Sequence, residues 1–270
     1  NEILGIDPGL VRLIHGDTGV TPYSTGTWGS RCMVMSGGAV ATACEALAER
    51  AKRIGASLLQ AEEADVRVEA GNVVSPNNSI SLGDIAKVWY LKPQDLPEDV
   101  DPAGLEVTVG YKPDVDSGTF SYAAHAVIVA IDTEIGQVEI LDYVIVEDGG
   151  VLVNPMIVDG QVYGGTVQGI GTALYEEMPF DDRGQPLAST FADYLLPGAA
   201  ESPDIRVLHM ETPSPYTRFG QKGIGESGAI GPPAAIGNAV NDALREFGAE
   251  VSQLPITPRR ILEALREAGS

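Results

Sequence analysis

The sequence is poor in cysteine, in histidine and in basic residues. It holds two cysteines and three histidines among 270 residues, and two cysteines cannot provide the ligand spacing of a zinc site or an iron–sulfur cluster. Lys and Arg number 17 against 38 Asp and Glu, which gives a net charge of −21. Because such a surface repels phosphate backbones and anionic lipid, we do not expect nucleic acid or a membrane surface as a partner.

Long apolar runs are also missing. The longest, residues 123–131, is far too short to cross a bilayer, so no membrane insertion is expected. No basic segment followed by an apolar run opens the chain, so we expect no signal peptide. Cys44 lies some turns along a helix predicted to start near Ser36, which makes a disulfide with Cys32 geometrically unfavourable. A reducing, cytoplasmic location is therefore expected.

Periodic apolar positions predict the main helices. A long helix is predicted around Val40 to Leu58, where apolar residues recur at every third or fourth position. Others are predicted at residues 82–90, after the cap-then-proline pairs Asn154-Pro155 and Thr257-Pro258, and from Pro232-Pro233 to near Gly248. The apolar residues that define the long helix are Val40, Ala43, Leu47, Ala51, Ile54 and Leu58.

Strands are predicted mostly in hairpins. Residues 123–131 and 137–146 form the clearest hairpin, and residues 66–68 and 72–74 a smaller one around Gly71. Because hairpins outnumber regular β-α-β alternation, the predicted class is α+β, with mixed sheets and packed helices. We expect a first subdomain over residues 1–110 and a second over residues 111–270. Single strands are also predicted at residues 11–15, near Phe191 and at residues 205–210.

Glycine-rich patches mark the places where a ligand could approach the backbone. They lie at residues 26–31, 164–171 and 220–233, and the first and third precede helices, whose N-termini favour anions. The second lies inside a helical pattern, where each glycine costs about 1 kcal/mol relative to alanine. Either close packing against a neighbouring element or a bound ligand explains that patch, and the sequence alone leaves both open.

Glu226 is the acid most suited to chemistry. It stands between glycines on the third patch, and a carboxylate held on a narrow loop can act as a general base. The alternative is a capping or salt-bridging glutamate at a surface turn. His15, His125 and His209 each lie in apolar, strand-like surroundings and are interpreted as packed histidines rather than as metal ligands.

The third patch also contains a G-x-G-x-x-G pattern, at Gly223, Gly225 and Gly228, which is typical of dinucleotide-binding folds. That fingerprint follows a hydrophobic strand and opens directly into a helix. Here residues 217–222 are polar, and Pro232-Pro233 is expected to delay the helix. We therefore reject a nicotinamide-binding domain.

Taken together, these segments resemble the large subunit of molybdenum hydroxylases, the family of xanthine dehydrogenase, aldehyde oxidase and carbon monoxide dehydrogenase. Residues 168–171 (QGIG) and 173–177 (ALYEE) resemble the family's molybdopterin-contacting helix. Asn154-Pro155 and Gly160-Gln161 precede it as in that family. Residues 222–227 (KGIGES) and 233–244 resemble the family's catalytic glutamate loop and the helix that follows it. Residues 15–18 (HGDT) and 26–31 (GTWGSR) resemble a loop that reaches the cofactor from the other side.

The resemblance implies an activity and a set of partners. It implies oxidation of an aldehyde or N-heteroaromatic substrate with water-derived oxygen, and Glu226 as the general base. It further implies a molybdopterin cofactor that is held by hydrogen bonds instead of protein–metal bonds. The cytosine dinucleotide form is one option for this cofactor. An upstream half of the large subunit is expected outside this chain, either as a separate subunit, as in nicotinate-dehydrogenase-like enzymes, or by truncation. FAD and 2Fe–2S clusters are expected on partner subunits. The residues implied to hold the cofactor are Gly29, Ser30, Arg31, Gln168, Gly169, Lys222, Gly223 and Gly225.

A second function stays open beside this one. A cofactor-free scaffold or assembly homologue, or an inactive truncated fragment, would keep the glycine frame and change the polar residues. The presence of Arg31, Gln168, Lys222 and Glu226 argues against it.

Overall fold

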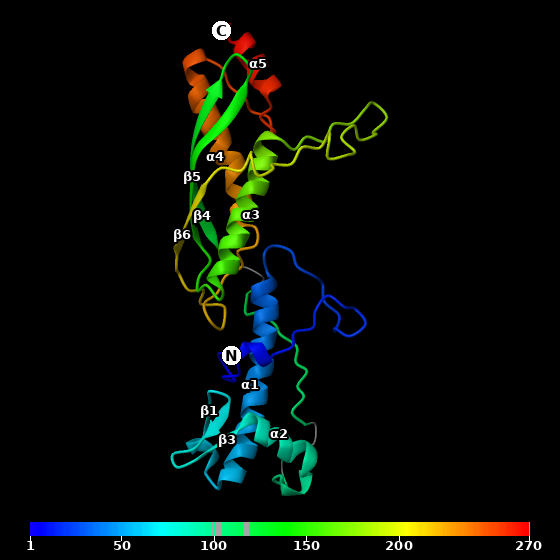
Figure 1. Cartoon of the computed structure of the whole chain (residues 1–270), viewed down its shortest axis with the longest axis vertical. Helices are drawn as coiled ribbons and strands as arrows, with labels where there is room; N and C mark the ends of the chain where they lie inside the picture. The colour runs from blue at the N-terminus through cyan, green and yellow to red at the C-terminus, as the bar shows by residue number, and fades with distance from the viewer. Residues whose placement is uncertain (99, 101–103, 116–118, 270) are drawn as a thin grey trace. The chain divides into compact units, whose positions relative to one another are not determined.

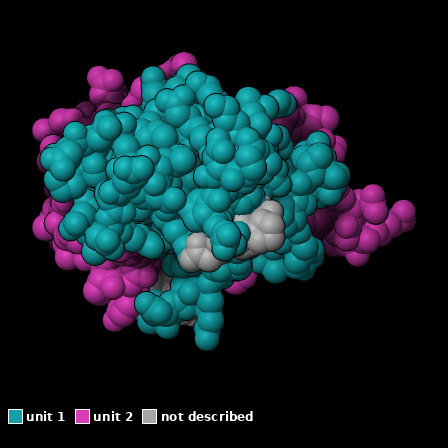
Figure 2. All heavy atoms as spheres, turned by 90° about the horizontal axis from the view of Figure 1, so that it is seen from below, with its two compact units in different colours: residues 1–27, 32–116 teal, residues 28–31, 117–270 magenta. Residues whose placement is uncertain are grey.

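The structure, a computed structural model, describes residues 1–98, 100, 104–115 and 119–269. The chain folds into two compact units, which Figure 2 colours separately. The first comprises Asn1–Thr27 and Cys32–Asp116, and the second Trp28–Arg31 and Ser117–Ser270. The segment Trp28–Arg31, which we had placed in the first subdomain, therefore packs with the second unit.

The first unit is built on the long helix α1 (Cys32–Leu59), which begins four residues before the predicted Ser36. The helix packs on an antiparallel sheet of β1 (Arg67–Glu69), β2 (Asn72–Val74) and β3 (Ser79–Ser81). The predicted hairpin and the predicted helix at 82–90, observed as α2 (Leu82–Leu91), are confirmed. Ser81 begins α2 by accepting a hydrogen bond from Asp84 N.

The buried face of α1 differs in part from the predicted one. Val40 is 58% exposed, whereas Ala51 and Ile54 are buried as predicted. Small residues, which the pattern of large apolar positions leaves out, also face inward. At Gly55, for example, a Cβ would come within 2.7 Å of the Val73 side chain. The buried residues of α1 are Val34, Gly38, Ala41, Ala48, Ala51, Ile54, Gly55 and Ala56.

Two local expectations in the first unit have clear outcomes. Residues 11–15, all of them described, form no strand, and Val11 is 58% exposed. A strand needs a partner ladder, and this segment pairs with none in the described part of the chain. Cys32 and Cys44 are both free. They lie on the same helix about 18 Å apart at 1.5 Å per residue, which confirms that they cannot form a disulfide.

The second unit contains the sheet β4-β5-β6. The predicted hairpin is confirmed as β4 (Tyr122–Asp132) and β5 (Gln137–Asp148), and the strand at 205–210 as β6 (Ile205–Met210). β6 pairs parallel with β5 through a crossover that contains α3 (Pro155–Leu174). This β-α-β connection differs from the predicted arrangement, in which strands pair through hairpins.

Helices α3 and α4 (Ser227–Leu244) pack on each other, and α4 packs on β4 (Figure 1). The core between them includes Tyr143, Val162, Ile170, Ile236 and Val240, all fully buried. α5 (Pro258–Glu267) adds Ile261 and Leu265. The caps of α3 and α5 are as predicted, because Asn154 accepts from Ile157 N and Thr257 accepts from Arg260 N.

The start of α4 was predicted wrongly. The helix begins at Ser227, five residues before Pro232, and both prolines lie inside it. A proline inside a helix removes a backbone hydrogen bond. Here Pro232 is buried and fills the space over Gly169 of α3, so packing offsets the missing bond.

The chain between α3 and β6, residues 175–204, is irregular and extends away from the sheet (Figure 1, yellow-green). The strand predicted near Phe191 does not form, and that side chain is 79% exposed. A hydrogen bond from Tyr194 to Glu176 ties the segment to the end of α3. Among the described residues, no helix combines the length and the apolar character needed to cross a membrane.

Candidate functional site

The Glu226 loop, residues 220–226, packs against the turn at residues 149–151, which follows β5. Lys222 N donates to Gly149 O at 2.8 Å, and Val151 N donates to Gly220 O at 3.1 Å. Gly150 has a φ of +65°, and a Cβ there would lie 2.3 Å from Gly220 O. Two backbones thus run closely side by side, which a larger residue at Gly150 would prevent.

Glu226 itself stands at the N-cap position of α4. Its side chain makes no capping hydrogen bond, so the capping alternative is wrong. Instead, Ser30 Oγ donates to Glu226 Oε2 at 2.8 Å, although the two residues are 196 positions apart. The carboxylate is exposed and can therefore reach a ligand.

The segment Trp28–Arg31 supplies the other wall of the site. Gly29 and Ser30 have φ values of 58° and 55°, a left-handed pair that turns the chain sharply. A Cβ on Gly29 would meet no atom within 4 Å, whereas one on Gly223 would lie 1.9 Å from Ser30 O. The Arg31 guanidinium lies 3.7 Å from the centre of the Trp28 ring, a cation–π contact.

A cavity of about 300 Å³ opens beside Glu226 and Ser30. Tyr122 and His125 of β4 line it, together with Gly231 of α4. A Cβ on Gly231 would lie 2.2 Å from the His125 ring, so this glycine makes room for the imidazole.

His125 is held from behind by β5. Its Nδ1 lies 2.8 Å from the Tyr143 hydroxyl. Burial lowers the pKa of the His125 ring, and the Ser227 backbone offsets this only in part. Burial likewise raises the pKa of Tyr143. His125 is thus packed against Tyr143, in line with the prediction, but its place at the cavity was not predicted.

The outer face of α3, defined here as Gly160, Gln161, Gly164 and Gln168, is exposed. A Cβ on Gly160 or Gly164 would meet no atom within 4 Å. Gln161 Nε2 comes within 3.6 Å of the Cβ position of Gly225, so its amide reaches the Glu226 loop. Gln161 was absent from the predicted cofactor residues, although its spacing of seven from Gln168 places both on one side of a helix.

The inner face of α3 uses its glycines differently. A Cβ on Gly165 would lie 3.1 Å from Ala229 N, and one on Gly169 would lie 2.8 Å from Ala229 O. These glycines let α3 and α4 approach closely. Close packing, one of the two explanations of the second glycine patch, is therefore confirmed for Gly165 and Gly169, and a bound ligand at Gly164 stays a prediction.

Lys222 is buried, and its ammonium group forms an ion pair within the protein. Its Nζ forms an ion pair with Asp148 Oδ1 at 2.9 Å and lies 4.9 Å from the centre of the Tyr122 ring. Burial alone would raise the pKa of Asp148, but hydrogen bonds from Thr212, Lys222 and Gly150 N outweigh it and hold that pKa well below its usual range. Lys222 thus anchors its loop, and its predicted contact with the cofactor stays a prediction.

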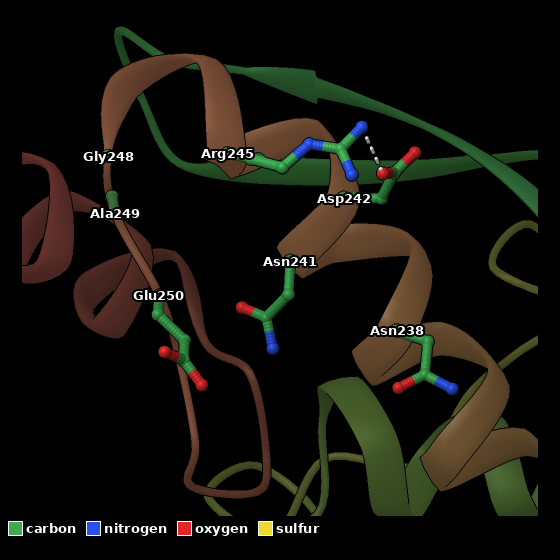
Figure 3. A pocket seen from close by; sticks show the side chains of 7 residues that line it. All are labelled: Asn238, Asn241, Asp242, Arg245, Gly248, Ala249 and Glu250. Carbon is green, nitrogen blue, oxygen red and sulfur yellow. Dashed lines mark ion pairs between the residues drawn. The ribbon is translucent and has the colours of Figure 1, made fainter.

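A second and larger cavity, of about 470 Å³, lies at the far end of α4 (Figure 3). Asn241, Arg245 and Glu250 line it, and Arg245 pairs with Asp242 at 2.8 Å. Asn241 is about 22 Å along the helix from Glu226 at 1.5 Å per residue. This cavity contains none of the predicted site residues.

The chain matches a known protein family over most of its length. The family model described as the molybdopterin cofactor-binding domain matches residues 1–203. The chain belongs to this family. The α+β fold predicted for such a domain is confirmed with it.

Relatives extend the match over nearly the whole chain. The large subunit of nicotine 6-hydroxylase from Paenarthrobacter nicotinovorans is 38% identical over 98% of this chain and 32% of its own length. The large chain of carbon monoxide dehydrogenase from Hydrogenophaga pseudoflava is 33% identical over 98% of this chain and 32% of its own. The chain thus spans about a third of the length of these relatives.

A solved structure shows the same fold. Quinoline 2-oxidoreductase from Pseudomonas putida 86 superposes with a TM-score of 0.85 and 37% identity, over 92% of this chain and 32% of that protein. The family model ends at residue 203, before the Glu226 loop, whereas these relatives continue through it.

The residues of the site fit a molybdopterin cofactor. The open backbone at Gly29, Gly160 and Gly164 leaves room that any larger side chain would fill. Gln161 and Gln168 offer amides, which suit the hydrogen-bonding edge of a pterin. Within residues 1–98, 100, 104–115 and 119–269, no group of His, Cys, Asp and Glu is arranged to bind a metal ion directly. Amide and hydroxyl groups of this kind suit an organic ligand held by hydrogen bonds.

Proposed function

We propose that this chain is the C-terminal, cofactor-facing part of the large subunit of a molybdenum hydroxylase. The observation that carries the proposal is Glu226, an exposed carboxylate at the start of α4 that borders a cavity and is oriented by Ser30. The substrate is an aldehyde or an N-heteroaromatic compound. Relatives named for nicotine and quinoline have 38% and 37% identity, against 33% for carbon monoxide dehydrogenase, which favours the heteroaromatic class.

In this function Glu226 acts as the general base. The hydrogen bond from Ser30 Oγ engages Oε2 and leaves Oε1 as the atom that takes up a proton. When bound, the molybdenum cofactor supplies the two-electron oxidation of the substrate carbon. Tyr122, His125 and Gly231 form one wall of the cavity beside this carboxylate.

The outer residues of the site would hold the cofactor. We assign this role to Gly29, Ser30, Arg31, Gln168 and Gly225, and add Gln161 to them. Contacts with other protein atoms are instead made by Gly169, Lys222 and Gly223. We propose that these three residues keep the backbone beneath the outer residues in place.

The rest of the enzyme is proposed to lie on other chains or segments. The relatives are about three times as long as this chain, which supports a further part of the large subunit outside it. FAD and 2Fe–2S clusters belong in this proposal to separate flavin and iron–sulfur subunits. The cytosine dinucleotide form of the cofactor and a cytoplasmic location are part of the same proposal.

Glu226→Gln in the assembled enzyme tests the role of the carboxylate. We expect the variant to keep its molybdenum and to lose on the order of 10²-fold or more in kcat, the size of a general-base contribution. The control is Glu246→Gln, an exposed carboxylate at the other end of α4, which should leave kcat unchanged. Wild-type turnover in Glu226→Gln would refute the assignment.

A further inference from the structure

Two adjacent acids end strand β5, directly after its apolar stretch Tyr143–Val146. Glu147 is 1% exposed and Asp148 is fully buried. A buried carboxylate is costly unless it is paired and hydrogen-bonded, so both residues need a structural explanation. The proposed role of Glu226 as a base does not use either of them.

Asp148 holds the beginning of the Glu226 loop. Lys222 Nζ is its ionic partner at 2.9 Å, and Gly150 N donates to the same Oδ1 at 2.9 Å. The loop therefore starts from a fixed point at the end of β5.

Glu147 holds the end of the same loop. Ser227 Oγ lies 2.9 Å from Glu147 Oε2 and 3.1 Å from Ile224 O. Ser227 is the first residue of α4 and follows Glu226 directly. A bond at Ser227 thus limits how far the backbone of Glu226 can move.

Glu147 is itself fixed from the far side. His209 of β6 is its register partner in the parallel ladder, and His209 Nδ1 lies 3.1 Å from Glu147 Oε1. The other ring nitrogen of His209 lies 2.7 Å from Asp159 Oδ1 on α3. Sheet, α3 and α4 are therefore joined through one buried carboxylate.

We propose that Glu147 is a positioning residue for Glu226 and acts through the Ser227 hydroxyl. The inference rests on the proposed function, in which Glu226 is the base. Between the two fixed points the loop contains Gly223 and Gly225, whose backbone is intrinsically mobile. Because a catalytic group must be held within about 0.5 Å of its working position, the ends of such a loop have to be anchored.

The test uses the assembled enzyme and variants of Ser227. In Ser227→Ala we expect kcat to fall roughly 10-fold to 10²-fold with KM nearly unchanged, because a displacement of about 1 Å costs up to that factor. Ser227→Thr keeps the hydroxyl and should restore most of kcat. Thr42→Ala, which removes a hydroxyl bonded to Gly38 O in α1, is the matched control and should leave kcat unchanged.

A double variant separates positioning from general stability. If Ser227 acts only through Glu226, adding Ser227→Ala to Glu226→Gln should cause no further loss of kcat. An equal loss in both backgrounds, or an unchanged kcat in Ser227→Ala, would overturn the proposal. Failure of the proposed function has a different signature, namely wild-type kcat in Glu226→Gln alone.

Variants of Glu147 test independently whether kcat depends on the hydrogen bond between Glu147 and Ser227. The amide oxygen of Glu147→Gln still accepts from Ser227, so this variant should keep most of kcat, whereas Glu147→Ala should lose as much as Ser227→Ala. Equal kcat losses in the two Glu147 variants would contradict a role that depends on this hydrogen bond. Molybdenum content, measured on every variant, shows that the cofactor remains in place; if Glu147→Ala does not assemble, the Ser227 series alone decides.

Discussion

The inner and the outer side of this site use the same residue types for different purposes. On α3, Gly169 faces inward and lies against Pro232 and Ala229, whereas Gly164 faces outward with no atom near its Cβ position. In the Glu226 loop, Lys222 is buried on Asp148 while Glu226 is exposed. The inner residues fix the frame, and the outer residues are left available to a ligand.

This contrast separates residues that the family resemblance had grouped. Gln168 and Gly169 are neighbours in sequence and were both assigned to the cofactor. A helix turns by about 100° per residue, so the two point in different directions: Gln168 is exposed, whereas Gly169 is buried against α4. We therefore propose cofactor contacts from exposure and from the space at each Cβ position as well as from the motif.

The largest effect is expected at the buried pair. Lys222→Met should reduce the free energy of unfolding by about 3–5 kcal/mol, because it leaves Asp148 buried without its counter-charge. Chemical denaturation of the full chain measures this. The matched control is Arg206→Met, which breaks the exposed pair with Asp142 and should cost less than about 1 kcal/mol.

A companion variant sharpens this result. Adding Asp148→Leu to Lys222→Met removes the uncompensated carboxylate and should recover much of the lost stability. If Lys222→Met were no more harmful than Arg206→Met, the inner side would not be the fixed part of the site.

The next effect concerns the inner face of α3. Gly169→Ala should destabilise the chain by about 1–3 kcal/mol, because its Cβ would lie 2.8 Å from Ala229 O and force α3 and α4 apart. Thermal unfolding measures the change. An unaltered unfolding temperature would show that the two helices do not depend on this close approach.

The outer face should respond in the opposite direction. Gly164→Ala should stabilise α3 by about 0.5–1 kcal/mol, since alanine favours helix and its Cβ meets no protein atom. In the assembled enzyme we expect less bound molybdenum, because the methyl group occupies space proposed for the cofactor. Higher stability with full molybdenum content would place the cofactor elsewhere.

The smallest effect is a dependence of stability on acid pH. The pKa of Asp148 in the folded chain lies below the unfolded value of about 3.9, so the folded state favours the charged form. This contribution to stability is fully present above that value and is lost as pH falls toward the folded pKa. Unfolding temperatures measured between about pH 5 and pH 3 should decline less in Asp148→Asn than in the wild type. Parallel curves would contradict the assignment.

Local signals predicted much of the fold. The starts of α3 and α5 followed from Asn154-Pro155 and Thr257-Pro258, because a cap acts within one turn of the helix. The start of α4 was missed because a local rule about Pro232 gave way to its packing on Gly169. Residues 11–15 had strand-like composition, but a strand also requires a partner, which composition does not reveal.

For the candidate site, the sequence singled out Glu226 and its flanking glycines, because they are close in sequence, but not the residues that support their loop. The bonds that orient it, from Ser30 and between Ser227 and Glu147, span 196 and 80 positions and exist only in the fold. A weak signal was present at Glu147 and Asp148, since two acids that directly follow the apolar stretch Tyr143–Val146 need buried partners.

The outer side of this site is proposed to hold a molybdenum cofactor. Metal analysis by mass spectrometry, on the chain purified from its native host with the proteins that accompany it, tests this proposal. We expect molybdenum together with iron, and partner chains of sizes suited to an iron–sulfur and a flavin subunit. An intact native complex without molybdenum would contradict the claim and favour a cofactor-free scaffold.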